Sequence, residues 1–453
     1  MFTVTIKAIN NILIGGSERT AIVKKNIIGS LAIRVVSIAT SLLLVPMTLG
    51  YVSAEIYGVW LTISSILHWL TYMDVGFTHG LKNRLNECLA RKEYEKGKSL
   101  VSTTYAIMFA IFVPMSTILI VVSPRIDWCS ILNVAPSNQE VILKTVQVLF
   151  VFIALQMIVN VFVTVVAAYQ KTALSSLFAV IGQVCSLCII GMMTLFVEPS
   201  LLNLAFAYST MPIVIVMTAS IIYFKTSMKD VAPSFNAINT AYIKDLWGLG
   251  IKFFIIQLQM IVLFQATNIL ISHIAGPESV TQYNISYKLL NVVVMVYSIF
   301  LNPLWPAFTD AYTKEDYAWM KNIYNKMQKL FGVLSVMVAV IVILSPFIIK
   351  LWVGEMVTVP FFLTISIAVY TLLHSWDSLQ VILINGTGKV TLQSYIILIG
   401  LVLHIPLSLF LGHYIGIYGV VASMSVINLI YACVFTTQIR MILNRTAIGI
   451  WNK

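Results

Sequence analysis

The run LFGVLSVMVAVIVILSPFIIKL, residues 330–351, decides the fold class of this chain. Its 22 residues carry a single charge, Lys350, next to the end of the run. A bilayer core of about 30 Å requires about 20 apolar residues when a chain crosses it as an α-helix. Lys326 and Lys329 stand just before the run, which gives it the pattern of a membrane span with a basic flank.

The whole chain shares the composition of that run. Of its 453 residues, 59% are hydrophobic and 10% are charged, whereas a soluble domain has roughly 45–50% and about 25%. A water-soluble fold is therefore excluded, and an all-α integral membrane protein is predicted. The net charge of +11 does not indicate a nucleic-acid partner, because surplus Lys and Arg of membrane proteins gather in cytoplasmic loops.

Apolar runs long enough to span a bilayer recur along the chain. Twelve are predicted, at about residues 27–49, 57–77, 100–122, 141–167, 173–197, 201–224, 248–273, 282–308, 330–351, 359–384, 391–412 and 414–439. Twenty-two of the 28 Lys and Arg fall in the tails and loops of one side, and only Arg125 and Lys350 fall on the other. The positive-inside rule then places both termini in the cytoplasm.

Corresponding features recur at an offset of 218 residues, which predicts an internal duplication. Lys389 follows Lys171 at this offset, and Lys252 follows Arg34. Two parallel six-helix halves with a cleft between them are expected. The predicted organisation is a cytoplasmic or interfacial tail (1–26), an N-terminal six-helix bundle (27–224), a cytoplasmic linker (225–247), a C-terminal six-helix bundle (248–439) and a cytoplasmic tail (440–453).

Motifs of the common catalytic classes are missing from the sequence. There is no Walker motif, HExxH, GxSxG or cluster of His and Cys at metal-ligand spacing. The predicted outer loops are also short, whereas membrane glycosyltransferases and polymerases usually act on sizeable outer loops. We expect a non-enzyme without cofactor or metal.

Cationic side chains within the spans are the first candidates for function, because ionisable groups are expensive in hydrocarbon. Arg34 lies about 10 Å inside the first span and stays protonated under any cellular condition. Its repeat-mate Lys252 and the outward-lying Lys288 suit an anionic group such as a pyrophosphate. The alternatives are a structural ion pair for Arg34, and a carbonyl partner or outward snorkelling for Lys288.

Asp377 is the one deep carboxylate, and His374 precedes it by three residues on the same helical face. A site for proton or cation coupling is one interpretation, since histidine titrates near neutrality. An internal salt bridge from Asp377 to Arg34 or Lys252 is the other.

Amide side chains recur in two spans. They are either interhelical hydrogen-bond partners or the lining of a wet, sugar-compatible cleft. The residues are Gln156 and Asn160 in the fourth span, and Gln257, Gln265 and Asn268 in the seventh.

Short motifs in both halves resemble the Wzx-type polysaccharide flippases of the MATE-like MOP superfamily. The residues that carry the resemblance are Leu49-Gly50, Glu55-Ile56-Tyr57-Gly58-Val59-Trp60, Asp74-Val75-Gly76, Asn83 with Arg84, Leu351-Trp352-Val353-Gly354 and Asn385-Gly386-Thr387-Gly388-Lys389. The order and spacing of these motifs resemble those of the flippases along nearly the whole chain. The twelve predicted spans and the two cytoplasmic tails agree with the same family.

The resemblance implies a function that composition alone does not. Such proteins move undecaprenyl-pyrophosphate-linked oligosaccharides across the bacterial inner membrane, for O-antigen, capsule or exopolysaccharide synthesis. Partners implied are the lipid-linked substrate, the bilayer, a polysaccharide polymerase and a chain-length regulator. Arg34 best matches the basic residue that related lipid II flippases carry on their first helix.

Two other functions remain open from the sequence. A cation-coupled multidrug antiporter of the same superfamily would call for buried carboxylates, yet the spans hold four cations and two carboxylates. A membrane glycosyltransferase or polysaccharide polymerase is the alternative from a different class.

Overall fold

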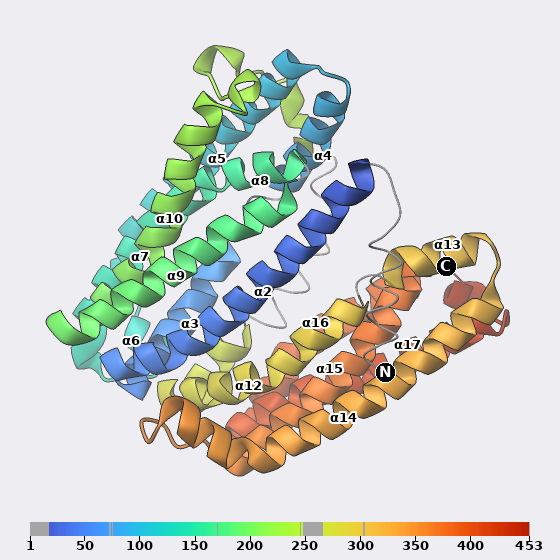
Figure 1. Cartoon of the computed structure of the whole chain (residues 1–453). Helices are drawn as coiled ribbons and strands as arrows, with labels where there is room; N and C mark the ends of the chain where they lie inside the picture. Colours follow the sequence, from blue (N-terminus) through green and yellow to red (C-terminus); the bar gives the residue numbers. More distant parts are fainter. Residues whose placement is uncertain are drawn as a thin grey trace. The chain divides into compact units, whose positions relative to one another are not determined.

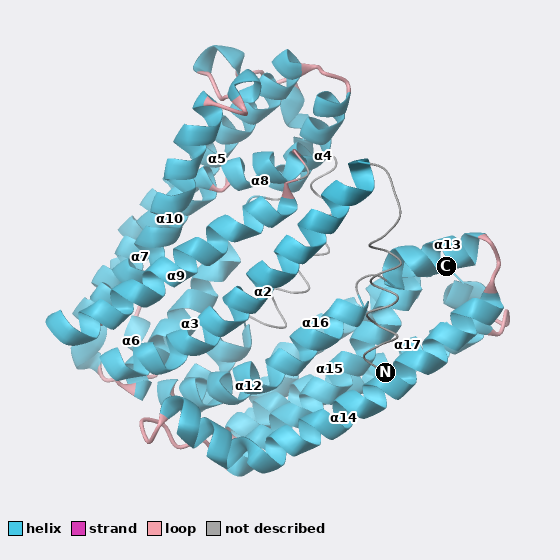
Figure 2. Cartoon of the chain, in the orientation of Figure 1, coloured by secondary structure: helices cyan, strands magenta, loops and turns pink. Residues whose placement is uncertain are grey.

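A computed structural model describes residues 18–71, 74, 76–169, 171–244, 246–247, 266–301 and 304–452. Throughout these ranges the regular structure is helical, and no strand occurs in them (Figures 1 and 2). The predicted all-α class is confirmed. The chain folds this way because, inside a bilayer, a helix satisfies its own backbone hydrogen bonds.

Within the described residues, nine α-helices are assigned in the first part of the chain, with short 3₁₀ turns between some of them. They are α2 (Glu18–Tyr51), α3 (Ala54–Thr71), α4 (Phe77–Ala90), α5 (Tyr94–Val122), α6 (Trp128–Leu132), α7 (Gln139–Val159), α8 (Val161–Ala168), α9 (Thr172–Phe196) and α10 (Leu201–Lys225). The 3₁₀ turns η4 (Lys229–Val231) and η5 (Phe235–Ala237) follow α10.

The second part begins, within the described residues, with a short apolar helix, Ala266–Ala275. It continues with α12 (Pro277–Leu301), α13 (Leu304–Thr313), α14 (Tyr317–Val353), α15 (Phe361–Thr387), α16 (Thr391–Ile415), α17 (Ile417–Leu443) and the 3₁₀ turn η6 (Gly449–Asn452).

Nine helical segments in the described part are long and apolar enough to cross a membrane. This makes the chain a multi-pass membrane protein. Most of the predicted seventh span, 248–273, lies outside the described residues, so the total of twelve stays a prediction.

Two predicted spans differ from the helices observed. The predicted span 141–167 is interrupted at Asn160, where α7 ends and α8 begins one residue later. The predicted span 330–351 is only the second part of α14, which starts at Tyr317. Asp316 caps this helix by accepting a hydrogen bond from the Trp319 amide at 3.0 Å, and no proline follows before Pro346.

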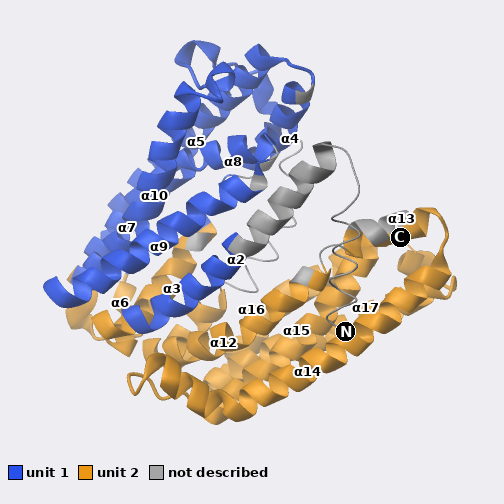
Figure 3. Ribbon diagram, viewed as in Figure 1, with its two compact units in different colours: residues 1–47, 70–126, 141–255 blue, residues 48–69, 127–140, 256–453 orange. Residues whose placement is uncertain are grey.

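The chain divides into two compact units (Figure 3). Unit 1 comprises Met1–Met47, Leu70–Ile126 and Val141–Ile255, and unit 2 comprises Thr48–Trp69, Asp127–Glu140 and Ile256–Lys453. Most of α3 and the segment around α6 therefore belong to unit 2, although both lie within the predicted N-terminal bundle, residues 27–224. The predicted domain boundaries stay predictions.

Each unit has its own packed helices. In unit 1, α9 packs on α10, and α4 packs on α5 and α8. In unit 2, α17 packs against both α15 and α16. The turn between α16 and α17 contains Gly416 in the left-handed region, at φ 59°, a conformation that glycine adopts without steric penalty.

Candidate functional site

Asp377 lies in the core of unit 2, near the middle of α15. It is 4% exposed, and neither carboxylate oxygen has a hydrogen-bond partner among the described residues. The charged form of a carboxylate is strongly disfavoured in such a setting unless a proton, a cation or a counter-ion accompanies it.

Gln380 follows Asp377 by three residues, so both side chains lie on one face of α15. It is fully buried, and its amide oxygen and nitrogen are both unpaired within the described part of the chain. A carboxylate beside an amide offers the oxygen ligands that a cation prefers.

His374 lies one turn before Asp377 on the same helix. Its ring stacks on that of Tyr370, with centroids 5.7 Å apart and an interplanar angle of 17°. Its side chain also hydrogen-bonds to Asn428 of α17. His374 is thus held between α15 and α17, beside the unpaired carboxylate.

A second buried polar cluster joins α16 to α17. Nδ1 of His404 lies 3.4 Å from the hydroxyls of Ser408 and Ser423, which are 2.5 Å from each other. His404 is fully buried, and its Nε2 has no partner among the described residues. This cluster was not predicted from the sequence, although the i, i+4 spacing of His404 and Ser408 in an apolar helix was a signal for it.

Arg34, the first predicted anion ligand, is exposed on α2 between apolar neighbours. Val35 and Val36 beside it are 66% and 47% exposed. The guanidinium therefore lies at the surface of unit 1, on a helix of spanning length. Lys252, Gln257 and Gln265 lie outside the described residues.

Lys288 is half-buried on α12, and its Nζ donates a hydrogen bond to Oη of Tyr57 on α3 at 3.3 Å. Tyr57 was not among the partners predicted for Lys288. Its predicted contact with an anionic substrate stays a prediction.

Asn268 forms an amide chain between helices. Its Nδ2 donates to Oγ of Ser65 at 2.8 Å, and its Oδ1 accepts from Nδ2 of Asn284 at 2.9 Å. These are the interhelical bonds that one interpretation of the amides predicts. Gln156 and Asn160 are half-buried in unit 1, and Asn160 forms the break between α7 and α8. The cleft-lining role of these amides stays a prediction.

Asp74, in one of the motifs that carry the family resemblance, shapes a turn before α4. Its carboxylate accepts hydrogen bonds from the Gly76 amide at 2.9 Å and from Oγ1 of Thr78 at 2.5 Å. Gly76 has φ 81°, in the left-handed region. The aspartate thus holds the turn that leads into α4, and the glycine is the N-cap of that helix in the left-handed conformation, which explains both residue types without a ligand.

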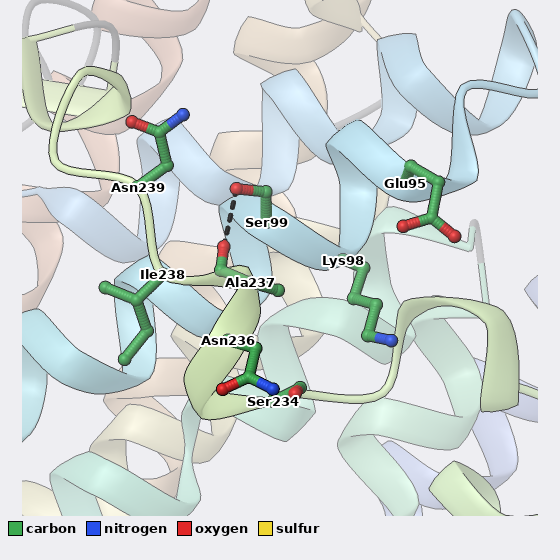
Figure 4. Close-up of a pocket in the computed structure, with 8 residues that line it drawn as sticks. All are labelled: Glu95, Lys98, Ser99, Ser234, Asn236, Ala237, Ile238 and Asn239. Carbon is green, nitrogen blue, oxygen red and sulfur yellow. Dashed lines mark hydrogen bonds between the residues drawn. The ribbon is translucent and has the colours of Figure 1, made fainter.

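A surface pocket of about 440 Å³ lies in unit 1, where residues 234–239 run along the start of α5 (Figure 4). Glu95, Lys98 and Asn236 are among the residues lining it. Oγ of Ser99 donates a 2.6 Å hydrogen bond to the carbonyl of Ala237 across its floor. The segment that was predicted as the cytoplasmic linker is thus fastened to α5.

Thr103 supplies two further bonds to this linker. Its Oγ1 accepts from the Asn239 amide at 3.0 Å and lies 3.3 Å from the carbonyl of the same residue. We expect Thr103→Val to loosen the linker, since each lost bond contributes about 1 kcal/mol. Trypsin should then cleave at Lys225 and Lys229 several-fold faster in inside-out vesicles.

The matched control for this substitution is Thr117→Val. Among the described residues, the hydroxyl of Thr117 bonds only to the Val113 carbonyl of the same helix. Equal cleavage rates in the Thr103 and Thr117 variants would contradict the fastening of the linker to α5.

No known protein-family profile matches this sequence, and no curated protein does either. Solved structures do match. An inward-facing conformation of a multidrug resistance MATE family transporter of the MOP superfamily superposes with a TM-score of 0.77 at 13% identity, covering 93% of this chain and 99% of that one. The chain has a MATE-like fold.

Two further structures agree with this fold. An outward-facing conformation of a multidrug resistance MATE family transporter gives a TM-score of 0.62 at 14% identity, with 95% and 97% of the two chains covered. A MATE transporter in the straight conformation gives 0.62 at 14% identity, with the same coverage. These neighbours are transporters and not enzymes, which is consistent with the predicted non-enzyme. The polysaccharide flippase subtype is not distinguished by them.

Proposed function

We propose that this MATE-like chain is a flippase that moves a lipid-linked anionic oligosaccharide across the bacterial inner membrane by alternating access. The fold supports transport, since the similar structures are transporters. The substrate class rests on Arg34. A guanidinium cannot neutralise itself, so its exposed position on an apolar helix of spanning length calls for an anion.

In this proposal the headgroup pyrophosphate binds to Arg34 and Lys252 from the cytoplasmic side. Arginine holds phosphate through two parallel hydrogen bonds, and lysine acts as a point charge. The prenyl tail stays in the bilayer while the predicted halves rock. Both termini are cytoplasmic, and a polymerase with its chain-length regulator takes up the product outside.

A multidrug antiporter is the second candidate, and it fits the structural neighbours equally well. The observation in its favour is Asp377, because an unpaired buried carboxylate is a binding partner for a cationic drug or a coupling ion. The cations Arg34, Lys252 and Lys288 in the predicted spans favour the flippase.

The deciding experiment locates the lipid-linked glycan in cells that lack this protein or carry Arg34→Ala. Spheroplasts are probed with a membrane-impermeant lectin or glycosidase. We expect glycan trapped on the inner leaflet in both strains, with outer-leaflet glycan reduced at least tenfold, because the variant no longer holds the pyrophosphate.

Two control variants keep the other charges in place. Arg34→Lys retains the positive charge and should keep partial transport. Lys350→Ala removes an exposed cation that pairs with Glu355 at 2.9 Å, and it should transport normally. Normal outer-leaflet glycan in the deletion strain, with altered drug efflux, would replace the flippase by the antiporter.

A further inference from the structure

The packing of unit 2 does not follow the predicted division of the chain into an N-terminal and a C-terminal half. Two segments of the predicted N-terminal half, 48–69 and 127–140, pack into unit 2. In the predicted topology 127–140 is part of an outer loop, and 48–69 runs from an outer loop into the second span. The N-terminal-half segments predicted to be cytoplasmic, 78–99 and 225–247, stay in unit 1. In the predicted topology, the exchange therefore begins at the outer side and reaches into the second span.

From these contacts we propose that the junction of α3 with α12 is the outer gate of this transporter, and that Lys288 and Tyr57 form its latch. We call this junction the α3–α12 seam. On α3 it consists of Ala54, Tyr57, Gly58 and Ser65, and on α12 of Pro277, Thr281, Asn284 and Lys288. Asn268, on the short helix Ala266–Ala275, also belongs to it. The proposal rests on the alternating-access function proposed above.

The seam is tightest at its outer end. Oγ1 of Thr281 donates a 2.7 Å hydrogen bond to the carbonyl of Ala54. One turn further along α3, a Cβ built on Gly58 would lie 1.8 Å from the carbonyl oxygen of Pro277. Only a glycine permits this approach of two backbones, so any side chain at position 58 acts as a wedge.

The seam extends deep into the membrane through polar contacts. Ser65 lies 11 residues beyond Ala54, which is about 16 Å along α3. Its hydroxyl accepts a hydrogen bond from Nδ2 of Asn268, and Oδ1 of Asn268 accepts one from Asn284. Polar bonds between membrane helices contribute modestly, because each group finds other partners when the helices part. Several bonds of this strength hold the two helices together in the closed form and still allow them to separate.

Lys288 latches this seam in the closed form. Its ammonium donates to the hydroxyl of Tyr57, a side chain only 1% exposed. A phenol is a weaker acceptor for an ammonium than a charged oxyanion. The bond therefore secures the closed seam and yields when water or an anion reaches Lys288.

The test measures water access to the seam directly. Ser65→Cys is introduced into a background whose five native cysteines are serines, and a membrane-impermeant maleimide is applied from outside. We expect little labelling of Cys at this position in the parent, because Ser65 is 4% exposed. Gly58→Val and Lys288→Ala should each raise labelling at least tenfold.

A matched glycine controls for the added bulk. Gly332 lies in α14 of the same unit, and a Cβ there meets nothing within 4 Å. Gly332→Val should leave labelling unchanged. Should Gly58→Val aggregate, Lys288→Ala carries the test without any clash. Labelling of monodisperse Lys288→Ala at the parental rate would overturn the latch, and full labelling of the parent would overturn the closed seam.

A second arm tests whether the seam must open for transport. Ala54→Cys with Thr281→Cys is joined by a short bis-methanethiosulfonate reagent. Cross-linked protein should lose transport and regain it on reduction, whereas undiminished transport would overturn the gate. The labelling arm does not depend on the substrate, so a failure of the flippase proposal is distinguishable from a failure of the gate.

Discussion

Asp377→Asn is expected to reduce transport at least tenfold and to remove its dependence on the coupling cation, while the protein still inserts and purifies in folded form. The carboxylate is buried and has no partner among the described residues, so its charge is available to a proton or a metal cation. Asparagine keeps the shape and removes that charge. The measurement is substrate movement in proteoliposomes under imposed sodium and proton gradients.

The control for this substitution is Ser366→Ala on the same helix. Ser366 is half-buried, and among the described residues its hydroxyl bonds only to the Phe362 carbonyl one turn earlier. Wild-type transport with unchanged cation dependence in Asp377→Asn would exclude a coupling role.

A salt bridge from Asp377 to Lys252 predicts a different pattern. Removing one member of a buried ion pair costs about 3–5 kcal/mol, because the other charge is left uncompensated. Asp377→Asn would then accumulate poorly, and the neutral pair Asp377→Asn with Lys252→Gln would restore accumulation. The coupling interpretation predicts no such rescue, because the single variant is already stable.

Gly419→Val is expected to prevent stable folding of unit 2. A Cβ at Gly419 would lie 2.3 Å from the carbonyl carbon and oxygen of Leu411 and 2.5 Å from the Gly412 amide nitrogen. All three are backbone atoms, so no side chain can move aside. Overpacking typically costs about 1–3 kcal/mol, and a backbone clash lies at or above the upper end of that range.

Thermal unfolding in detergent, followed by the fraction of monodisperse protein, measures this effect. The control is Gly332→Val, which adds the same atoms where the structure leaves open space. A melting temperature of Gly419→Val within a degree of the control would contradict the close approach of α16 and α17.

Much of the helical framework could be predicted from local sequence. Residues 173–197 and 201–224 were predicted as spans, and α9 and α10 occupy Thr172–Phe196 and Leu201–Lys225. Local signals suffice here because span length is set by bilayer thickness. The signal fails where a polar residue breaks an apolar run, as at Asn160, or where a charged connector continues a helix, as in α14.

The candidate site was predictable in its residue types and only partly in its contacts. Asp377 is recognisable from the sequence because it is a charged residue within an apolar run. The stacking of His374 on Tyr370, in contrast, depends on side-chain positions in the folded protein. The same holds for Lys288, whose partner Tyr57 is 231 residues away.

By itself, the sequence determined that this chain is a helical membrane protein with basic residues gathered on one predicted side. Only the tertiary structure decided that most of α3 and the α6 segment pack with unit 2, and that Ser423 of α17 meets His404 of α16. The reason is that spanning helices are apolar on nearly every face, so their hydrophobic pattern records that they are buried in lipid or protein but not which helix lies beside them.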